Sequence, residues 1–243
     1  MDQSANIELS VILPAYLEEE NLRILLPRLI QTLEKMHLTF EVIVVDTATP
    51  MDQTNEVCGS CKVTYVNRRE TNSFGDAVRT GIATARGRRI IFMDSDGSHT
   101  PEFIPKLYQH ADQADVVIAS RYVKGGVTEN PRHLIWMSLF LNWTYSVVLN
   151  LRCKDVSNSF KLYSAEQLKQ LELTCDNFDI VEEILYKLHK LNKGLRIFET
   201  PFIFRKRIFG ETKRNLGMFI LTYLVTIVKL RLMPVRPKKP SSV

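Results

Sequence analysis

The sequence contains few cysteines and shows no internal repeat. Four cysteines among 243 residues are too few for a disulfide scaffold and are typical of a protein kept under reducing conditions. The N-terminus lacks a basic region followed by an apolar run, so no secretory signal is expected. We therefore expect one domain, or one domain with an appendage, facing the cytosol.

The cysteines do not form a recognisable metal or redox site. Cys58 and Cys61 have the spacing of such a motif, but no second pair accompanies them. Cys153 and Cys175 stand far apart and lack nearby histidines. Structural zinc sites almost always use four ligands, so we interpret the pair as structural.

Acidic residues are scarce at the C-terminal end. Residues 205–243 include ten Lys and Arg side chains and one acid, Glu211, although the whole chain carries only +5. A basic end on a mildly acidic body indicates a localised anionic partner, such as a phosphate, a lipid headgroup or nucleic acid. The same distribution argues against a uniformly basic nucleic-acid-binding coat.

The remaining composition, 45% hydrophobic and 24% charged, is that of a globular protein with a substantial core. Short β-branched runs alternate with longer helical patterns. Strands are predicted at residues 8–13, 40–46, 62–66, 89–94 and 115–120, and helices at residues 19–36 and 73–86. This order predicts an α/β fold, with a Rossmann-like, mostly parallel sheet flanked by helices and ligands at the strand C-termini.

Two later segments are apolar but do not match a membrane span. Residues 133–151 contain no Asp, Glu, Lys or Arg, and a polar residue recurs every fourth position at Ser138, Asn142, Ser146 and Asn150. Such a stripe predicts an amphipathic helix at an interface. Residues 216–228 are uncharged but shorter than the roughly 20 residues needed to span a bilayer. Residues 233–243, rich in Pro and basic side chains, are predicted to be a disordered tail.

The segment most informative about chemistry is Asp94-Ser95-Asp96, directly after an apolar strand. Two carboxylates at this spacing can engage a hard divalent cation and leave positions open for phosphate oxygens. Taken alone, they could equally be turn or capping acids.

Two other strand ends support the functional interpretation. Tyr16 and Glu18 follow the first predicted strand, and Asp46 ends the second. Because the ends of parallel strands converge on one crevice, we expect these side chains to surround a base and ribose. Asp94 and Asp96 would then hold the metal and a diphosphate.

With these positions the sequence resembles glycosyltransferase family 2, which has the GT-A fold, and within it the dolichol-phosphate mannose synthase and polyprenyl-phosphate branch. The resemblance covers roughly residues 8–215. The family's opening box is matched by Pro14, Tyr16, Glu18 and Asn21, with Leu17 in place of Asn, and its metal segment by Asp94, Asp96, Ser98 and His99. Its central segment is matched by Ser120, Arg121, Tyr122, Gly125 and Gly126, and a later one by Asp155, Ser159, Phe160, Leu162 and Tyr163, with Lys161 replacing Arg. The closing box is matched by Glu199, Pro201, Phe204, Arg207, Gly210 and Lys213, with Thr212 replacing Ser.

Three departures from the family pattern affect what the resemblance implies. Residues 47–53 lack the second Asp and the Gly that the family has after its second strand, which leaves the base and donor open. The Gly-rich turn before the third helix is reduced to a single Gly75. The family's acceptor-side Arg would fall at Leu134 if Ser138 is the matching Ser, with Arg132 as a substitute.

The resemblance implies an inverting, metal-dependent transfer of a mannose- or glucose-type hexose from a nucleotide diphosphate sugar to a polyprenyl (dolichyl or undecaprenyl) monophosphate. Mg²⁺ or Mn²⁺ is the implied cofactor. The implied location is the cytoplasmic face of a membrane, as a peripheral or monotopic protein, with a small membrane subunit or a second copy as further partners and no nucleic acid. A lipid phosphate monoester is already anionic near pH 7, so no catalytic base is assigned.

Roles for individual residues follow from the resemblance. Donor binding is expected from Pro14, Tyr16, Glu18, Val45, Asp46, Gly75, Asp94, Ser95 and Asp96, and metal binding from Asp94, Asp96 and Ser98. The acceptor phosphate is expected to meet Arg121, Arg132 and Ser138, and catalysis to depend on Asp96, Arg121, Arg207 and Lys213. Residues 1–214 would form the catalytic domain and residues 215–243 a membrane-associating helix and tail.

Two other interpretations stay open. A soluble family 2 transferase acting on a saccharide or protein hydroxyl would need a base, for which Glu182 or Glu183 are candidates. A catalytically degenerate protein that binds nucleotide or lipid would account for the altered residues 47–53. The Gln-x-x-Arg-Trp box of processive polysaccharide synthases is absent, so chain elongation is not expected.

Overall fold

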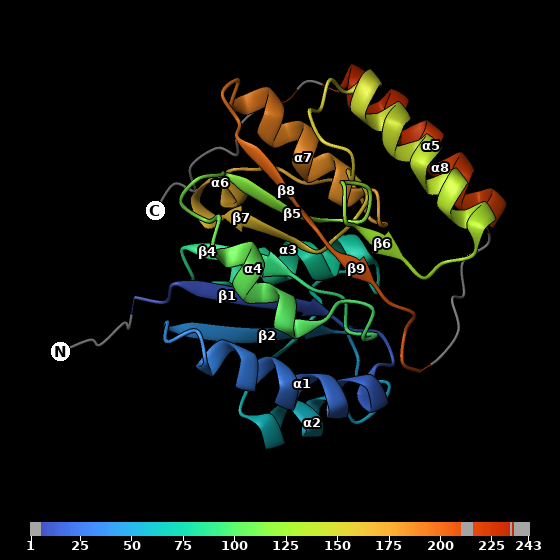
Figure 1. Ribbon diagram of the computed structural model, residues 1–243. Coiled ribbons are helices and arrows are strands. Elements are labelled where there is room, and N and C mark those ends of the chain that lie inside the picture. Colours follow the sequence, from blue (N-terminus) through green and yellow to red (C-terminus); the bar gives the residue numbers. More distant parts are fainter. Residues whose placement is uncertain (1–5, 210–215, 234, 236–243) are drawn as a thin grey trace, which may run out of the picture.

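The computed structural model describes residues 6–209, 216–233 and 235. A seven-stranded sheet in the order β3-β2-β1-β4-β7-β5-β8 runs through its centre (Figure 1). Its strands are β1 (Leu9–Pro14), β2 (Phe40–Asp46), β3 (Thr64–Asn67), β4 (Arg89–Phe92), β5 (Val116–Ser120), β7 (Lys161–Ser164) and β8 (Ile197–Pro201). Neighbouring strands are parallel except at β7, which is antiparallel to both β4 and β5. The short strands β6 (Val127–Thr128) and β9 (Ile203–Phe204) pair separately.

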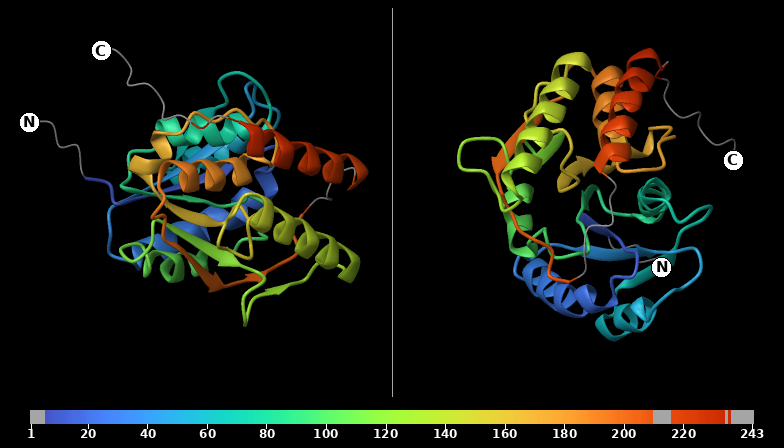
Figure 2. Two further views of the ribbon diagram at one scale, coloured as in Figure 1. Left: turned by 90° about the horizontal axis from the view of Figure 1, so that it is seen from above. Right: turned by 90° about the vertical axis from the view of Figure 1, so that its right-hand side faces the viewer.

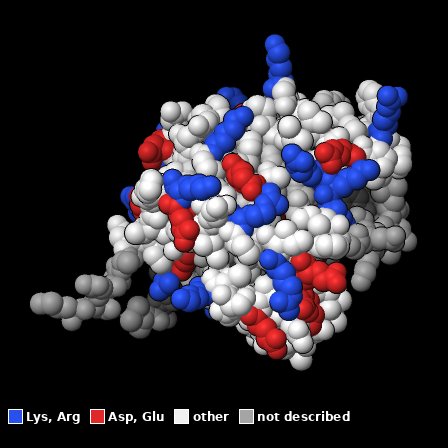
Figure 3. Space-filling view, turned by 60° about the horizontal axis from the view of Figure 1, so that its bottom comes forward, with Lys and Arg blue, Asp and Glu red and all other residues white. Residues whose placement is uncertain are grey.

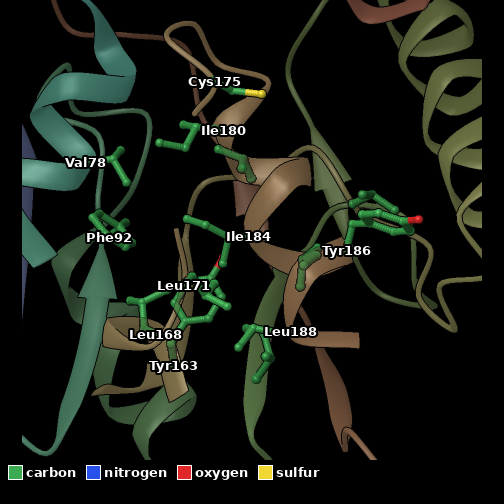
Figure 4. Packing of buried hydrophobic residues seen from close by; sticks show 14 of the residues in the cluster. Val78, Phe92, Tyr163, Leu168, Leu171, Cys175, Ile180, Ile184, Tyr186 and Leu188 are labelled. Carbon is green, nitrogen blue, oxygen red and sulfur yellow. The ribbon is translucent and has the colours of Figure 1, made fainter. Parts of the chain in front are cut away.

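Helices cover both faces of the sheet because the strands are apolar on both faces. In β1, Leu9, Val11 and Leu13 pack towards helices α1 (Glu19–Glu34), α2 (Thr54–Cys61) and α4 (Ile104–Tyr108). Ile12 packs on the opposite side, towards α3 (Phe74–Thr84), α6 (Ala165–Lys169) and α7 (Ile180–Leu191). Figure 4 shows part of this second core, where Ile184 and Leu188 of α7 approach Leu168 and Tyr163. Alternation along buried strands thus builds two cores from one sheet.

The predicted fold class is confirmed. All five predicted strands are present, as are the helices predicted at residues 19–36, 73–86 and 133–151, with ends shifted by a few residues. Ser73 caps α3 as expected, because its hydroxyl accepts the backbone N–H of Asp76 at 3.1 Å. The sequence did not reveal β7, β8, α6 and α7.

The face formed by α1 and α2 carries charges of both signs. Figure 3 shows Lys and Arg interspersed with Asp and Glu there rather than gathered into one basic area. Several are paired, including Arg23 with Glu19 at 2.8 Å and Arg28 with Glu102 at 2.9 Å. This mixed face differs from the basic stripe of a nucleic-acid-binding protein.

Helices α5 (Arg132–Val148) and α8 (Leu216–Leu232) lie side by side at one end of the molecule (Figures 1 and 2). The Tyr145 hydroxyl of α5 donates to the Tyr223 carbonyl of α8 at 3.0 Å. The Thr226 hydroxyl donates at 2.7 Å to Asp179, which precedes α7. Helix α8 is therefore docked against the body by buried polar contacts.

The orientation of α5 sharpens the prediction of an interfacial helix. Its polar stripe faces the protein, with Asn142 only 1% exposed, while Trp136 on the apolar side is 73% exposed. No helix within the described ranges is long and apolar enough to cross a membrane. The expected domain boundary after residue 214 and most of the expected disordered tail lie outside the described residues.

The close packing of α3 on β1 leads to a stability prediction. A Cβ at Gly81 would lie 2.5 Å from Ile12 Cγ2, so Gly81→Ala should lower the free energy of unfolding by about 1–3 kcal/mol. The matched variant Gly59→Ala lies in α2 with nothing within 4 Å, and should raise it by roughly 0.5–1 kcal/mol through helix propensity. Urea unfolding of both variants tests the pair, and equal effects would contradict the packing argument.

Candidate active site

The candidate site lies where strand ends meet at one edge of the sheet. The segments after β1, β2 and β4 leave the sheet there because these strands are parallel. The antiparallel strand β7 starts at the same edge, since its first residue, Lys161, pairs with Phe92 at the end of β4. Residues preceding β7 therefore join residues following the other strands.

Three carboxylates and one guanidinium gather at this edge. Asp94 and Asp96 follow β4, Glu18 precedes α1, and all three are partly exposed. Arg207 Nη2 lies 3.2 Å from Glu18 Oε1 and 3.6 Å from Asp96 Oδ2. Burial raises the pKa of Glu18, and Asp96 and Asp94 act in the same direction. The arginine thus offsets part of a concentrated negative charge.

The oxygen atoms at this edge could supply only part of the coordination shell of a hard cation. Asp94 and Asp96 offer carboxylate oxygens, and the buried Ser98 hydroxyl has no hydrogen-bond partner among the described residues. Within that part of the chain, no three His, Cys, Asp or Glu side chains form a complete cage. Oxygen ligands with open positions suit Mg²⁺ or Mn²⁺ bound together with substrate phosphate oxygens.

His99 supports the Asp94 loop from inside the protein. Its Nδ1 accepts the Asp94 backbone N–H at 2.9 Å, so Nε2 carries the proton and faces Asn158 Oδ1 at 3.1 Å. The ring stacks on Phe160 with centroids 4.7 Å apart. Burial lowers the pKa of His99, so the side chain is a neutral support.

Residues 155–159 are the main connection between the parts of the site. Alternate side chains in this segment are directed to site residues: Ser159 donates to Asp94 Oδ1 at 2.8 Å, and Asp155 binds Arg121. Asp155 and Ser159 were expected from the family resemblance. Ser157, between them, accepts from Arg121 Nη2 at 3.0 Å and was missed.

Arg121 is held in a buried ion pair. Its Nε lies 2.9 Å from Asp155 Oδ2 and its Nη2 2.6 Å from Asp155 Oδ1, while its side chain is 10% exposed. Although burial opposes the charged form, Asp155 holds the pKa of Arg121 above its ordinary value. Its Nη1 has no hydrogen-bond partner among the described residues. One edge of the guanidinium is thus fixed by hydrogen bonds, and its Cζ lies 5.0 Å from the Tyr122 ring centroid and 5.5 Å from the Phe204 ring centroid.

The residues expected to bind the donor differ in accessibility. Tyr16 is 44% exposed. Asp46 is buried, its Oδ2 accepts the Tyr65 hydroxyl at 3.0 Å, and burial raises its pKa. The Ser95 hydroxyl donates to the Pro14 carbonyl at 2.8 Å and ties two loops together.

Two residues expected to bind the donor, Val45 and Gly75, take part in packing. The Val45 side chain lies in the core, and its carbonyl accepts the Ala15 N–H at 2.9 Å. The Gly75 N–H donates to the Asp176 carbonyl at 2.7 Å. A Cβ at Gly75 would lie 2.1 Å from the Cys175 carbonyl oxygen, so close backbone packing requires glycine here.

Arg68 was missed by sequence reasoning. Its buried guanidinium donates to the Ala15 carbonyl at 2.6 Å and to the Asn72 carbonyl. It therefore joins the loop after β1 to the turn before α3. The strand-end rule that identified Asp46 would have found Arg68 if applied to β3.

The remaining candidates are spread over several elements. Arg132 is exposed at the start of α5, and the Ser138 hydroxyl lies 3.3 Å from Asn142 Nδ2. Lys213, with Gly210 and Thr212, lies outside the described residues.

Glu182 and Glu183 cannot serve as an accessible base. Both are completely buried in α7. Glu183 accepts the Cys175 N–H at 2.8 Å and pairs with Lys187 at 2.7 Å. The base that a hydroxyl acceptor would need is therefore not provided by either residue.

The mostly parallel sheet, with an Asp-x-Asp pair at its carboxyl edge, defines a glycosyltransferase of the GT-A fold. The chain belongs to glycosyl transferase family 2, whose model matches residues 10–172.

Curated relatives and solved structures agree with this assignment. The chain is 33% identical over 231 residues to dolichol-phosphate mannosyltransferase of Pyrococcus furiosus, an alignment covering 92% of this chain and 64% of that protein. It is 29% identical over 217 residues to polyprenol monophosphomannose synthase of Mycolicibacterium smegmatis, covering 84% and 80%. Glucosyl-3-phosphoglycerate synthase from Mycobacterium tuberculosis, solved with Mn²⁺, UDP and glucosyl-3-phosphoglycerate, has a TM-score of 0.69 at 17% identity, covering 95% of this chain and 82% of that one. At that identity the likeness concerns the fold.

The loop after β1 contains a residue with a strained backbone, and a substitution can relieve that strain. Leu17 has a φ of 56° where the family has Asn, and left-handed backbone costs roughly 1–2 kcal/mol for most residues but less for Asn. Leu17→Asn should raise the free energy of unfolding by about 0.5–1 kcal/mol. Ile24→Asn is a matched control, since both side chains are 42% exposed but Ile24 lies within α1. Ile24→Asn should not raise the free energy of unfolding. If urea unfolding shows no larger gain for Leu17→Asn than for this control, Leu17 is not strained.

Proposed function

We propose that this chain transfers a hexose, with inversion, from a nucleotide diphosphate sugar to a polyprenyl monophosphate. The observation that carries the proposal is that a negatively charged site and a positively charged site contact the same segment of the chain. Partly exposed carboxylates, Asp94 and Asp96, stand on one side, and the buried, preoriented Arg121 stands on the other. Residues 155–159 contact both. The names of the two curated relatives support a prenyl phosphate acceptor.

The donor diphosphate would lie over Asp94 and Asp96 with Mg²⁺ or Mn²⁺. When bound there, the cation supplies positive charge that stabilises the departing diphosphate. Arg207, already 3.6 Å from Asp96, would exchange its contact with Glu18 for the diphosphate, and Lys213 would assist it. Tyr16 would contact the base or ribose.

The acceptor phosphate would bind Arg121 through Nη1, with Arg132 and Ser138 completing the site. A phosphate oxygen forms the new bond to the anomeric carbon from the side opposite the diphosphate, whose bond to that carbon breaks. The nucleophile is already anionic, so no proton has to be removed. This agrees with the burial of Glu182 and Glu183 and disfavours a hydroxyl acceptor.

The apolar surface of α5 and α8 would place the acceptor site at a membrane. We call this surface the α5–α8 face, and each of its side chains is at least 58% exposed: Trp136, Phe140, Trp143, Val147, Val225, Val228 and Leu232. Aromatic and aliphatic side chains beside Lys229 and Arg231 match an interfacial helix on anionic lipid. The face would rest on the cytoplasmic leaflet, where the prenyl phosphate would be presented.

A donor and acceptor screen tests the function. The protein is incubated with labelled GDP-mannose or UDP-glucose, a polyprenyl phosphate and Mg²⁺ or Mn²⁺. Asp96→Ala should lower transfer by at least about 100-fold and abolish the Mn²⁺-dependent rise in melting temperature caused by the nucleotide. Asp112→Ala, which removes a fully exposed acid, should change neither quantity.

Two outcomes of the screen would decide against the proposal. Nucleotide binding without transfer to any acceptor would favour a degenerate binding protein, as the altered residues 47–53 allow. Transfer to a hydroxyl acceptor, with none to prenyl phosphate, would favour the soluble transferase.

Vesicle binding tests the α5–α8 face. Replacing Trp136, Phe140 and Trp143 by Ser should weaken cosedimentation with anionic vesicles more than about tenfold, because three large apolar side chains no longer enter the interface. Ile24→Ser, an exposed apolar residue on α1, serves as the control. Unchanged binding of the triple variant would exclude this face as the membrane contact.

A further inference from the structure

Helix α5 buries an amide rather than an apolar side chain where it meets the body. Asn142 is 1% exposed, whereas Trp136 and Trp143 on the same helix point to the surface. A buried amide is costly unless its donors and acceptor are satisfied. The partners of Asn142 therefore show what the inward side of this helix contacts.

Asn142 forms a two-point contact with Ser157. Its Nδ2 donates to Ser157 Oγ at 3.0 Å, and its Oδ1 accepts the Ser157 backbone N–H at 2.9 Å. Nδ2 also donates to the Ser138 carbonyl one helical turn earlier, at 2.8 Å. One side chain of α5 thus fixes both the backbone and the hydroxyl of Ser157.

Ser157 passes this constraint to Arg121. The same Ser157 Oγ accepts from Arg121 Nη2 at 3.0 Å, and that nitrogen also donates to Asp155 Oδ1 at 2.6 Å. The guanidinium plane is therefore set by three hydrogen bonds, two to Asp155 and one to Ser157, and only the one to Ser157 depends on α5. Loss of the Ser157 contact would leave Arg121 paired with Asp155 but freer to tilt, and Nη1 would lose its fixed direction.

We propose that Asn142 is a positioning residue that couples the packing of α5 on the protein body to the orientation of Arg121, through Ser157, for binding of the acceptor phosphate. The inference rests on the proposed function, because it assigns the acceptor phosphate to Arg121. Asn142 itself touches no substrate.

The coupling should act on the acceptor and spare the donor. Asp94 is held by Ser159 at 2.8 Å and by His99 at 2.9 Å, and neither contact involves Asn142. A residue needed only for folding would disturb both sides together. Selective loss of acceptor affinity is therefore the signature of positioning.

The experiment uses three variants of the full chain. Asn142→Leu keeps similar volume but makes no hydrogen bond. Asn142→Asp keeps the acceptor for the Ser157 N–H and loses the donor to Ser157 Oγ. Thr144→Val is the matched control, because it removes a hydroxyl on the same helix that donates only to the Phe140 carbonyl, at 2.8 Å. Urea unfolding and vesicle cosedimentation verify that each variant folds and still reaches the membrane.

The primary measurement is the dissociation constant of a short, water-soluble prenyl phosphate, followed by fluorescence of the chain's two tryptophans, Trp136 and Trp143, both of which lie on α5. Asn142→Leu should raise this constant about tenfold, the scale of a hydrogen bond to a charged group, while Thr144→Val leaves it unchanged. In the transfer assay, the acceptor KM should rise similarly at constant donor KM.

The outcomes separate the inference from the proposed function. If the native chain binds the prenyl phosphate and Asn142→Leu binds it equally well, the inference is overturned. Donor and acceptor KM rising together would reduce Asn142 to a structural role and overturn it as well. Binding by the native chain without transfer from any donor would refute the proposed function alone, since the change in dissociation constant would still be measured. No binding of prenyl phosphate by the native chain would refute both.

Discussion

The ion pair between Arg121 and Asp155 is the interaction on which both halves of the site depend. Two charges with so little access to water are tolerated only when their hydrogen bonds are satisfied, and here Asp155 also accepts the Arg121 backbone N–H at 2.8 Å. The Asp155 N–H in turn donates to Glu199 of β8 at 3.0 Å. These contacts anchor residues 155–159, and the anchored segment supports Asp94 through Ser159 and α5 through Ser157. The carboxylate side and the Arg121 side of the site therefore share one support.

Burial gives carboxylates of the same type different tasks. Asp94 and Asp96 remain partly exposed, so they can exchange water for a cation and phosphate oxygens. Asp155 is completely buried and already paired, so it can only hold Arg121. The resulting site has a negative side and a positive side, which matches a reaction between a metal-bound diphosphate and a second phosphate.

Strong local patterns made the sheet and the carboxylates predictable, whereas long-range partners did not. Four of the five predicted strands contain at least three consecutive apolar residues, whereas β7 contains only Leu162 and Tyr163, between Lys161 and Ser164. Asp94, Asp96 and Glu18 follow or adjoin strand ends, so a rule about parallel sheets locates them. Ser157, Asn142 and Arg68 acquire their roles from segments distant in sequence. The spacing on α5 revealed two faces but could not tell which one meets the protein. The role of Gly75 could not be chosen from sequence, because a glycine at a helix start suits a phosphate and a close backbone neighbour equally well; the structure shows the close neighbour.

The reversed direction of β7 has a consequence for how α5 is carried. Since β5 and β7 are antiparallel neighbours, the chain between them leaves and re-enters the sheet at the same edge, as in a very long hairpin. Arg121 follows β5, Asp155 precedes β7, and 34 positions separate them. Their ion pair therefore joins the two ends of this loop. Helix α5 lies entirely within this loop. Its exposed apolar face can therefore change without altering the strands that carry the carboxylates.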